Sequence, residues 1–133
     1  MPIKGLDHVN LRAARPLLKT LRDFYVEVIG LREGERHLPS HGYWLYAEDK
    51  AILHLSAERP DEPRPADVCN TFDHVAFACS ELTEFIARLQ RLNIEYRLAE
   101  PTADGHRQIF LTDPAGNGVE LNFPPEHRDR LYP

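Results

Sequence analysis

The feature that most constrains the fold is a motif that occurs twice at a fixed distance. The tripeptide Asp-His-Val at residues 7–9 returns at residues 73–75, which is 66 positions later. The same offset carries Leu-His-Leu at residues 53–55 onto Val-Glu-Leu at residues 119–121, and it carries Trp44 onto Phe110. Because three separate places agree on one offset, we predict that the chain is a tandem duplication of one structural unit.

The first copy has the sequence pattern of a βαβββ module. Residues 5–12 alternate polar and apolar side chains, which predicts a strand, and residues 16–28 carry apolar side chains at helical spacing. Three short strands are predicted after the helix, at residues 31–36, 43–47 and 51–56. The first module therefore covers residues 5–56.

The second copy repeats this series of elements. A strand at residues 72–79 precedes a helix at 81–92, for which Ser80 is the predicted N-cap. Three further strands are predicted at residues 94–99, 107–112 and 118–123. The second module therefore covers residues 71–123.

The two modules are expected to form a single α+β domain over residues 1–133. Residues 57–70 contain three prolines among charged side chains, which is typical of a linker, and residues 124–133 are interpreted as a polar tail. Neither module alone buries the face of its sheet well, so we expect the two mixed sheets to associate as a curved cup.

The composition excludes several classes of partner. A formal charge of -5 lacks the basic excess of a nucleic-acid-binding protein, so no nucleic-acid partner is expected. No apolar run approaches the roughly 18 residues that cross a bilayer, and the N-terminus lacks the apolar segment of a signal peptide. The two cysteines, Cys69 and Cys79, are interpreted as free thiols, which favours a cytoplasmic protein with no membrane partner.

Strand alternation selects a candidate metal site from the seven histidines. His54 alternates with leucines that face the helix, and Glu120 alternates with apolar residues in the same way. His8 and His74 fall on the corresponding faces of their own strands, 46 residues before His54 and Glu120 respectively. Three imidazoles and one carboxylate around one cavity would bind a divalent metal such as Fe, Mn, Ni, Co or Zn.

An alternative is that each histidine is an ordinary core residue, since histidine is often part-buried. The carboxylate of Glu120 lies between two apolar neighbours and would be costly to bury without a partner, which favours the metal site. The remaining histidines, His37, His41, His106 and His127, are interpreted as surface residues, and Cys79 as a small core residue.

Other side chains on the same faces are candidates for contacting a substrate. Trp44 and Phe110 would wall the pocket, or they fill the core between the sheets. Asn10, Arg12 and Asn122 share the face and are placed to hold a polar or anionic small molecule.

The ordered set of motifs resembles the vicinal oxygen chelate superfamily, which includes glyoxalase I, methylmalonyl-CoA epimerase, fosfomycin-resistance enzymes, extradiol dioxygenases and bleomycin-resistance proteins. The resembling stretches are LDHV at residues 6–9, DFY at 23–25, GL at 30–31, FDHV at 72–75 and DPAGNGVEL at 113–121. The resemblance covers about residues 5 to 123, which is nearly the whole chain.

This resemblance implies a glyoxalase-like cup with metal ligands at His8, His74 and Glu120, in a homodimer that can share the site between chains. Glyoxalase I carries a carboxylate at the fourth position and the epimerase carries Gln, whereas this chain has His54. The similarity to extradiol dioxygenases implies instead that His54 is an acid–base group beside a three-ligand metal. Those enzymes carry Tyr ten residues before the ligand Glu, where this chain has Phe110.

We therefore expect a metal-dependent lyase or isomerase of glyoxalase type that acts on a small oxygenated substrate. The metal would polarise a carbonyl, and Glu120 and His54 are the candidate catalytic residues for proton transfer. An iron-dependent extradiol-type dioxygenase is the alternative. A non-enzymatic binder similar to the bleomycin-resistance proteins is a third interpretation, against which the four retained candidate ligands argue.

Overall fold

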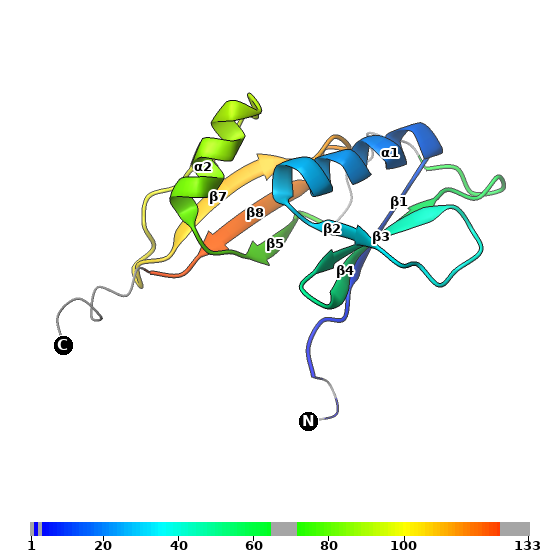
Figure 1. Ribbon diagram of the computed structural model, residues 1–133, viewed down its shortest axis with the longest axis horizontal. Coiled ribbons are helices and arrows are strands. Elements are labelled where there is room, and N and C mark those ends of the chain that lie inside the picture. The colour runs from blue at the N-terminus through cyan, green and yellow to red at the C-terminus, as the bar shows by residue number, and fades with distance from the viewer. Residues whose placement is uncertain (1, 3, 65–71, 126–133) are drawn as a thin grey trace. The chain divides into compact units, whose positions relative to one another are not determined.

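A computed structural model describes residues 2, 4–64 and 72–125 of the chain. It divides the chain into two compact units, residues 1–68 and 69–133 (Figure 1). Residues 65–70 of the predicted linker and residues 126–133 of the predicted tail lie outside the described residues, as do Cys69 and His127.

The first unit is a four-stranded mixed sheet with helix α1 packed on it. Strand β1 (Val9–Ala13) is parallel to β4 (Lys50–Ala57), and β3 (Gly42–Ala47) runs antiparallel to β4 and to β2 (Arg32–Gly34). The strand order is β1-β4-β3-β2. Between β1 and β2 the chain forms α1 (Arg15–Phe24) and a π-helical turn, η1 (Tyr25–Ile29).

The second unit repeats this architecture. Strand β5 (His74–Ala78) is parallel to β8 (Gly118–Phe123), and β7 (Arg107–Thr112) is antiparallel to β8 and to the short β6 (Arg97–Leu98). The order β5-β8-β7-β6 matches that of the first unit, and helix α2 (Leu82–Arg91) follows β5. The predicted α+β fold of two βαβββ modules is confirmed.

The duplication extends to the pairing of individual residues. In the first unit His54 pairs with Asn10 on β1 and with Trp44 on β3. In the second unit Glu120 pairs with Ala76 on β5 and with Phe110 on β7, which are the same positions 66 residues later. His54 and Glu120 therefore occupy equivalent central positions of two equivalent sheets.

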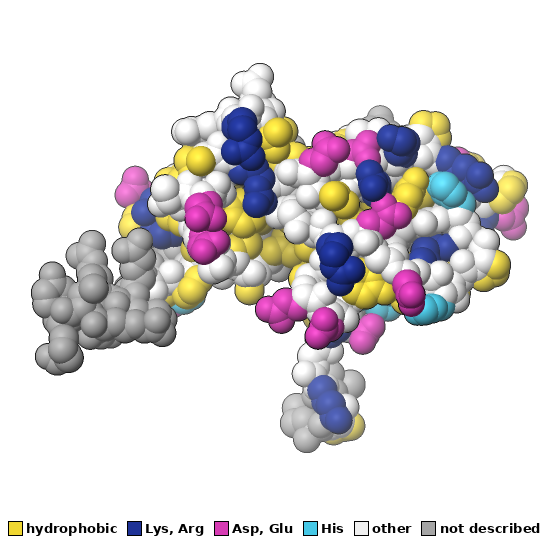
Figure 2. Space-filling view, viewed as in Figure 1, with side chains coloured by type: hydrophobic (Ala, Val, Ile, Leu, Met, Phe, Trp, Pro, Cys, Tyr) yellow, Lys and Arg dark blue, Asp and Glu magenta, His cyan; other side chains and the backbone are white. Residues whose placement is uncertain are grey.

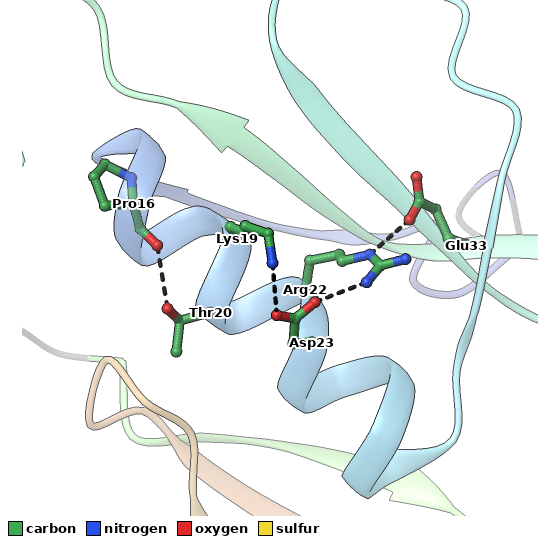
Figure 3. A network of polar contacts seen from close by, with 6 residues as sticks. All are labelled: Pro16, Lys19, Thr20, Arg22, Asp23 and Glu33. Carbon is green, nitrogen blue, oxygen red and sulfur yellow. Dashed lines mark hydrogen bonds and ion pairs between the residues drawn. The ribbon is translucent and has the colours of Figure 1, made fainter.

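Helix α1 joins its sheet through apolar and ionic contacts. Leu18 and Leu21 are almost fully buried, as are Leu53 and Leu55 of β4, and burying one such side chain stabilises the fold by about 2 kcal/mol. The charged contacts are labelled in Figure 3: Arg22 Nε donates to Glu33 Oε1 of β2 at 2.7 Å, and Arg22 Nη1 donates to Asp23 Oδ1 within α1 at 2.7 Å.

The end of the first predicted helix differs from the prediction of one regular helix over residues 16–28. From Tyr25 the helix widens into η1, whose backbone carbonyl at Tyr25 accepts from the N–H groups of Gly30 and Leu31. The wider turn buries Tyr25, Val28 and Ile29 together, and Gly30 ends it with a φ of 97°.

Two other expected boundaries were wrong. Strand β1 begins at Val9, so His8 precedes the strand instead of lying within it. Ser80 is not the N-cap of α2, because Glu81 occupies that position with a φ of 66° and no side chain caps the helix. Helix α2 is held instead by its apolar side, where Leu89 is fully buried and Phe85 meets the ring of Phe123 edge to face at 5.6 Å.

The surface of the described residues carries both signs of charge. Figure 2 shows Lys and Arg side chains interspersed with Asp and Glu side chains over the unit that contains α1. Within the described part of the chain, no helix has the length and apolar content needed to cross a membrane.

Candidate functional site

His8 and His74 have the same arrangement with the residue that precedes each of them. The Nδ1 atom of His8 lies 2.8 Å from Oδ2 of Asp7, and Nδ1 of His74 lies 2.7 Å from Oδ2 of Asp73. A carboxylate that accepts a hydrogen bond from Nδ1–H fixes the tautomer of an imidazole. The lone pair on Nε2 then remains available. The two carboxylate–histidine dyads therefore each present an Nε2 atom that suits a metal ligand.

The first unit places the ring of His54 against two other rings. The ring of His54 stacks on His8 with centroids 3.8 Å apart, and on its other side it stacks on Trp44 at 4.3 Å. The Nε2 atom of His54 lies 3.2 Å from the backbone oxygen of Ala51. We call Asp7, His8, His54 and Trp44 the first half-site.

The environment of His54 keeps its imidazole neutral. Burial lowers the pKa of His54, and the nearby charge of His8 lowers that pKa further. A neutral imidazole suits either a metal ligand or a base, so this shift agrees with both roles that the sequence suggests for His54.

The second unit places a carboxylate where the first unit has His54. The Nε2 atom of His74 lies 3.5 Å from Oε1 of Glu120, and Gln108 Nε2 donates to Glu120 Oε2 at 3.3 Å. The hydrogen bond that His74 donates to Asp73, together with the charge of Glu120, raises the pKa of His74. We call Asp73, His74, Glu120 and Gln108 the second half-site.

Together with Asp113, Glu120 is one of two buried acidic residues among those that the structure describes. Only 8% of its surface is exposed, although its side chain points away from the apolar face formed by its neighbours Val119 and Leu121. A buried carboxylate needs compensating donors or cations, and His74 and Gln108 supply part of this compensation. This environment suits a carboxylate that pairs with a cation.

The predicted substrate residues have specific partners within their own units. Asn10 Oδ1 accepts from Ser56 Oγ at 2.7 Å, and Arg12 Nη1 donates to the backbone oxygen of Ala57 at 2.7 Å. The guanidinium of Arg97 lies over the ring of Phe110 at 4.6 Å. The Oδ1 atom of Asn122 is buried and has no hydrogen-bond partner among the described residues, so this amide is available to a ligand.

The four candidate ligands fall into two pairs, one in each unit. Among the described residues, no three His, Cys, Asp or Glu side chains gather closely enough to hold a metal. His8 and His54 are together in the first unit, and His74 and Glu120 are together in the second. The donor types and the Asp residue before each of His8 and His74 suit a divalent metal, and each unit by itself brings together two of the four candidates.

Some contributing residues were not identified from the sequence. Asp7 and Asp73 lie inside the repeated motif itself, so the repetition of an acidic residue before each histidine was the available signal. The role of Gln108 was not detectable, because it depends on the pairing of β7 with β8, which sets Gln108 diagonally across from Glu120.

The other described histidines have polar or aromatic neighbours outside the half-sites. His106 Nδ1 lies 3.0 Å from Asp104 Oδ1, and His41 meets Tyr43 edge to face at 5.6 Å. His37 is the exception, because its ring contacts the edge of Trp44 at 5.8 Å and so borders the first half-site.

A separate cavity of about 690 Å³ lies in the second unit beside the first turn of α2. It is lined by residues of that turn, by Arg107 and Phe123, and by Pro124 and Pro125. A smaller hollow includes Cys79, His106 and Asn122. Burial raises the pKa of the Cys79 thiol, which keeps it protonated.

Comparison with known proteins agrees with this architecture. Residues 5–121 match the Glyoxalase/Bleomycin resistance protein/Dioxygenase superfamily. A solved structure from Bacillus anthracis that is described as a glyoxalase family protein is 26% identical, with a TM-score of 0.72 over 92% of this chain and 96% of that chain. No curated protein was found to match the sequence.

Two further solved structures illustrate the range of similar proteins. Lactoylglutathione lyase from Agrobacterium tumefaciens is 23% identical, with a TM-score of 0.68 over 92% of this chain and 96% of that chain, so it shares the fold. The antibiotic binding protein TnmS3 from Streptomyces sp. CB03234 is 25% identical, with a TM-score of 0.67 over 93% and 98% of the two chains. The match over residues 5–121 shows that this chain belongs to the Glyoxalase/Bleomycin resistance protein/Dioxygenase superfamily.

Proposed function

We propose that this protein is a metal-dependent lyase or isomerase of glyoxalase type. His8, His74 and Glu120 are the proposed ligands of a divalent metal, and His54 occupies the fourth position of the set. The observation that carries the proposal is the pair of equivalent carboxylate–histidine dyads, in which Asp7 and Asp73 each fix the Nδ1 side of a histidine. Such pairs are a common support for metal-binding histidines.

The proposed chemistry is proton transfer next to a carbonyl group. A bound divalent metal supplies Lewis-acid polarisation of that carbonyl. The carboxylate of Glu120 accepts the proton, and the amide of Gln108 at 3.3 Å orients the carboxylate for this transfer. The side chains of Trp44 and Phe110 form apolar walls in this proposal, and the free amide oxygen of Asn122 binds a donor group of the substrate.

The two half-sites are proposed to be joined in a homodimer in the cytoplasm. Each unit holds only part of the ligand set, so a complete site needs one half-site of each kind, taken from the same chain or from two chains. The small-molecule substrate is proposed to be oxygenated, because the polar side chains of Asn10, Arg12 and Asn122 are proposed to line the site.

The deciding experiment combines metal analysis with turnover. Protein purified without chelator is expected to contain stoichiometric Ni, Co, Zn or Mn and to convert a hemithioacetal without oxygen uptake. The variants His74→Ala and Glu120→Gln are expected to lose the metal. His106→Ala is the matched control, because His106 has its own aspartate partner outside both half-sites. Absence of metal from the wild type, or its retention in both site variants, would refute the proposal.

An iron-dependent extradiol-type dioxygenase is the second candidate. The neutral His54 beside His8 favours it, because an acid–base histidine near a metal held by two His and one Glu fits that chemistry. Stoichiometric iron with oxygen uptake on catechols would select this candidate. The similarity to an antibiotic binding protein makes binding without turnover a third outcome of the same assays.

A further inference from the structure

His54, Trp44 and His8 form a continuous stack of three nearly parallel rings. Centroids are 3.8 Å apart between His8 and His54 and 4.3 Å apart between His54 and Trp44, and the interplanar angle is 12° in both pairs. We infer that His54 is a positioning residue, which holds the imidazole of His8 by ring stacking and does not itself bind the metal. The metal in this inference rests on the proposed function, whereas the positioning of His8 rests on the ring stack alone.

The geometry of the two rings argues against a shared metal ion. The lone pair of an imidazole nitrogen lies in the plane of its ring, so rings stacked 3.8 Å apart and 12° from parallel direct their lone pairs side by side. Two ligands of one ion must instead direct their lone pairs to one point, about 2.0–2.1 Å from each nitrogen for Zn²⁺. His54 would have to leave the stack to join His8 on one ion.

His54 also has contacts that hold it in the stack. Its Nε2 atom lies 3.2 Å from the carbonyl oxygen of Ala51, and this oxygen accepts the Nε2–H of the neutral ring. Its second face is covered by Trp44, the residue paired with it on β3, and Trp44 is contacted in turn by the edge of His37. The ring of His54 is therefore held in place by contacts with residues of its own sheet.

His8 is the ring that needs this support. It precedes β1, and 37% of its side chain is exposed, so the sheet ladder does not fix it directly. Asp7 constrains the Nδ1 side of the ring, and the face of His54 constrains the ring plane. Together the two contacts leave one direction for Nε2 of His8.

The second half-site shows what the same positions do without stacking. Glu120, which replaces His54 in the repeat, meets His74 through its carboxylate at 3.5 Å. Phe110, which replaces Trp44, is covered by the guanidinium of Arg97. The two half-sites therefore differ in kind: the first supplies one positioned ligand, and the second supplies a histidine and a carboxylate.

The test compares His54→Phe, which keeps an aromatic ring and removes both nitrogens, with His54→Ala, which removes the ring. Zn²⁺ affinity measured by calorimetry is expected to stay within about twofold in His54→Phe and to fall about 10–100-fold in His54→Ala, as for the loss of a supporting residue. Cu²⁺ electron paramagnetic resonance is expected to count the same number of nitrogen ligands in wild type and His54→Phe. His41→Ala is the control, because His41 contacts Tyr43 outside the stack.

A readout without metal separates this inference from the proposed function. In the metal-free protein, the ring protons of His8 should be shifted upfield in the NMR spectrum by the stacked ring. This shift should persist in His54→Phe and disappear in His54→Ala. If His54→Ala does not fold, Trp44→Phe provides a second variant, because it keeps an aromatic ring at one end of the stack. Trp44→Phe is expected to preserve Zn²⁺ affinity.

Equal loss of Zn²⁺ affinity in the two His54 variants, with one nitrogen fewer in the Cu²⁺ spectrum of His54→Phe, would show that His54 is a ligand and overturn the inference. If the wild type binds no metal, the proposed function fails, and the NMR shifts of His8 alone decide whether His54 positions that ring. Unshifted His8 protons in the wild type would overturn the inference in either case.

Discussion

The Nε2 atom of His74 lies 3.5 Å from Oε1 of Glu120, so a histidine on β5 and a buried carboxylate on β8 face each other within one unit. Their counterparts in the first unit, His8 and His54, contact each other through ring faces instead. One duplicated sheet thus supports an acid–histidine pair in one copy and an aromatic stack in the other.

Replacing Asp73 with Asn should weaken metal binding about 10–100-fold, because the carboxylate bonded to Nδ1 supports His74 as a ligand. The same change should lower the pKa of His74, since the hydrogen bond that His74 donates to the Asp73 carboxylate is the largest cause of its raised value. Calorimetry with Zn²⁺ and an NMR titration of His74 measure the two effects. Asp104→Asn removes a similar carboxylate–histidine contact at His106 and should leave Zn²⁺ affinity unchanged.

Gly118→Ala should disturb the second half-site without touching a ligand atom. A Cβ at this position would lie 2.5 Å from the backbone oxygen of Asp73 and 2.9 Å from Cβ of His74, so the dyad must shift. We expect lower unfolding temperature and lower metal affinity together. Gly116→Ala is the control: its Cβ would meet open space and its φ of 87° costs about 1 kcal/mol, so it should lower stability alone. Equal metal affinity in the two variants would contradict this explanation.

Asp113→Ala should destabilise the second unit by about 2–3 kcal/mol, as expected when a buried group that satisfies several donors is removed. The Asp113 carboxylate accepts from the backbone N–H groups of Ala115 and Asn117 and from the Asn117 side chain, each at 2.9 Å. Urea unfolding measures the change. Asp49→Ala lies in the corresponding exposed turn of the first unit and should change the free energy of unfolding by less than about 0.5 kcal/mol.

The stability that Asp104 contributes to the protein should decrease in acid. Hydrogen bonds from Thr102 and then from His106 lower the Asp104 pKa to about 2, from an ordinary value of 3.8 for an aspartate. Because the folded-state pKa is the lower one, the stabilisation is present above about pH 4 and is lost as the pH falls toward 2. Melting curves of the wild type and Asp104→Asn should therefore differ at pH 6 and converge as the pH drops toward 2. A difference that stayed constant over this range would show that the Asp104 charge is not responsible.

Mixing two inactive variants tests whether the metal site is shared between chains. If each site combines half-sites from two chains, co-refolded His8→Ala and Glu120→Gln should regain about a quarter of the wild-type metal, because random pairing leaves one intact site in each heterodimer. Each variant refolded alone should contain none. A mixture that regains no metal would place both half-sites of a site in one chain.

Much of the fold was predictable because it follows from local alternation and from the repeat. The strands at 107–112 and 118–123 match β7 and β8. In β8 the buried Val119, Leu121 and Phe123 alternate with polar residues. The residue at which α2 begins was less predictable. Ser80 has the chemistry of a cap, but the chain enters the helix through a left-handed residue, Glu81, whose conformation is set by the surrounding structure.

The contents of the candidate site were predictable as residue types but not as contacts. The offset linked His54 to Glu120, because sequence position alone defines that correspondence. The offset did not reveal that His54 would stack on another ring and that Glu120 would pair with a histidine. Side-chain orientation depends on neighbours across the strands, such as Trp44. His8 was expected within a strand over residues 5–12, but it lies just before β1 because its backbone is not part of the ladder with β4.

Trp44 is the chain's single tryptophan, and it lies at one end of the ring stack. Its fluorescence therefore comes from one known position, in van der Waals contact with His54 and one ring removed from His8. Protonated imidazoles and paramagnetic ions quench indole emission at short range. The protein thus contains its own optical probe, and titrations of Cu²⁺ or Co²⁺ can be followed in the first half-site without any label.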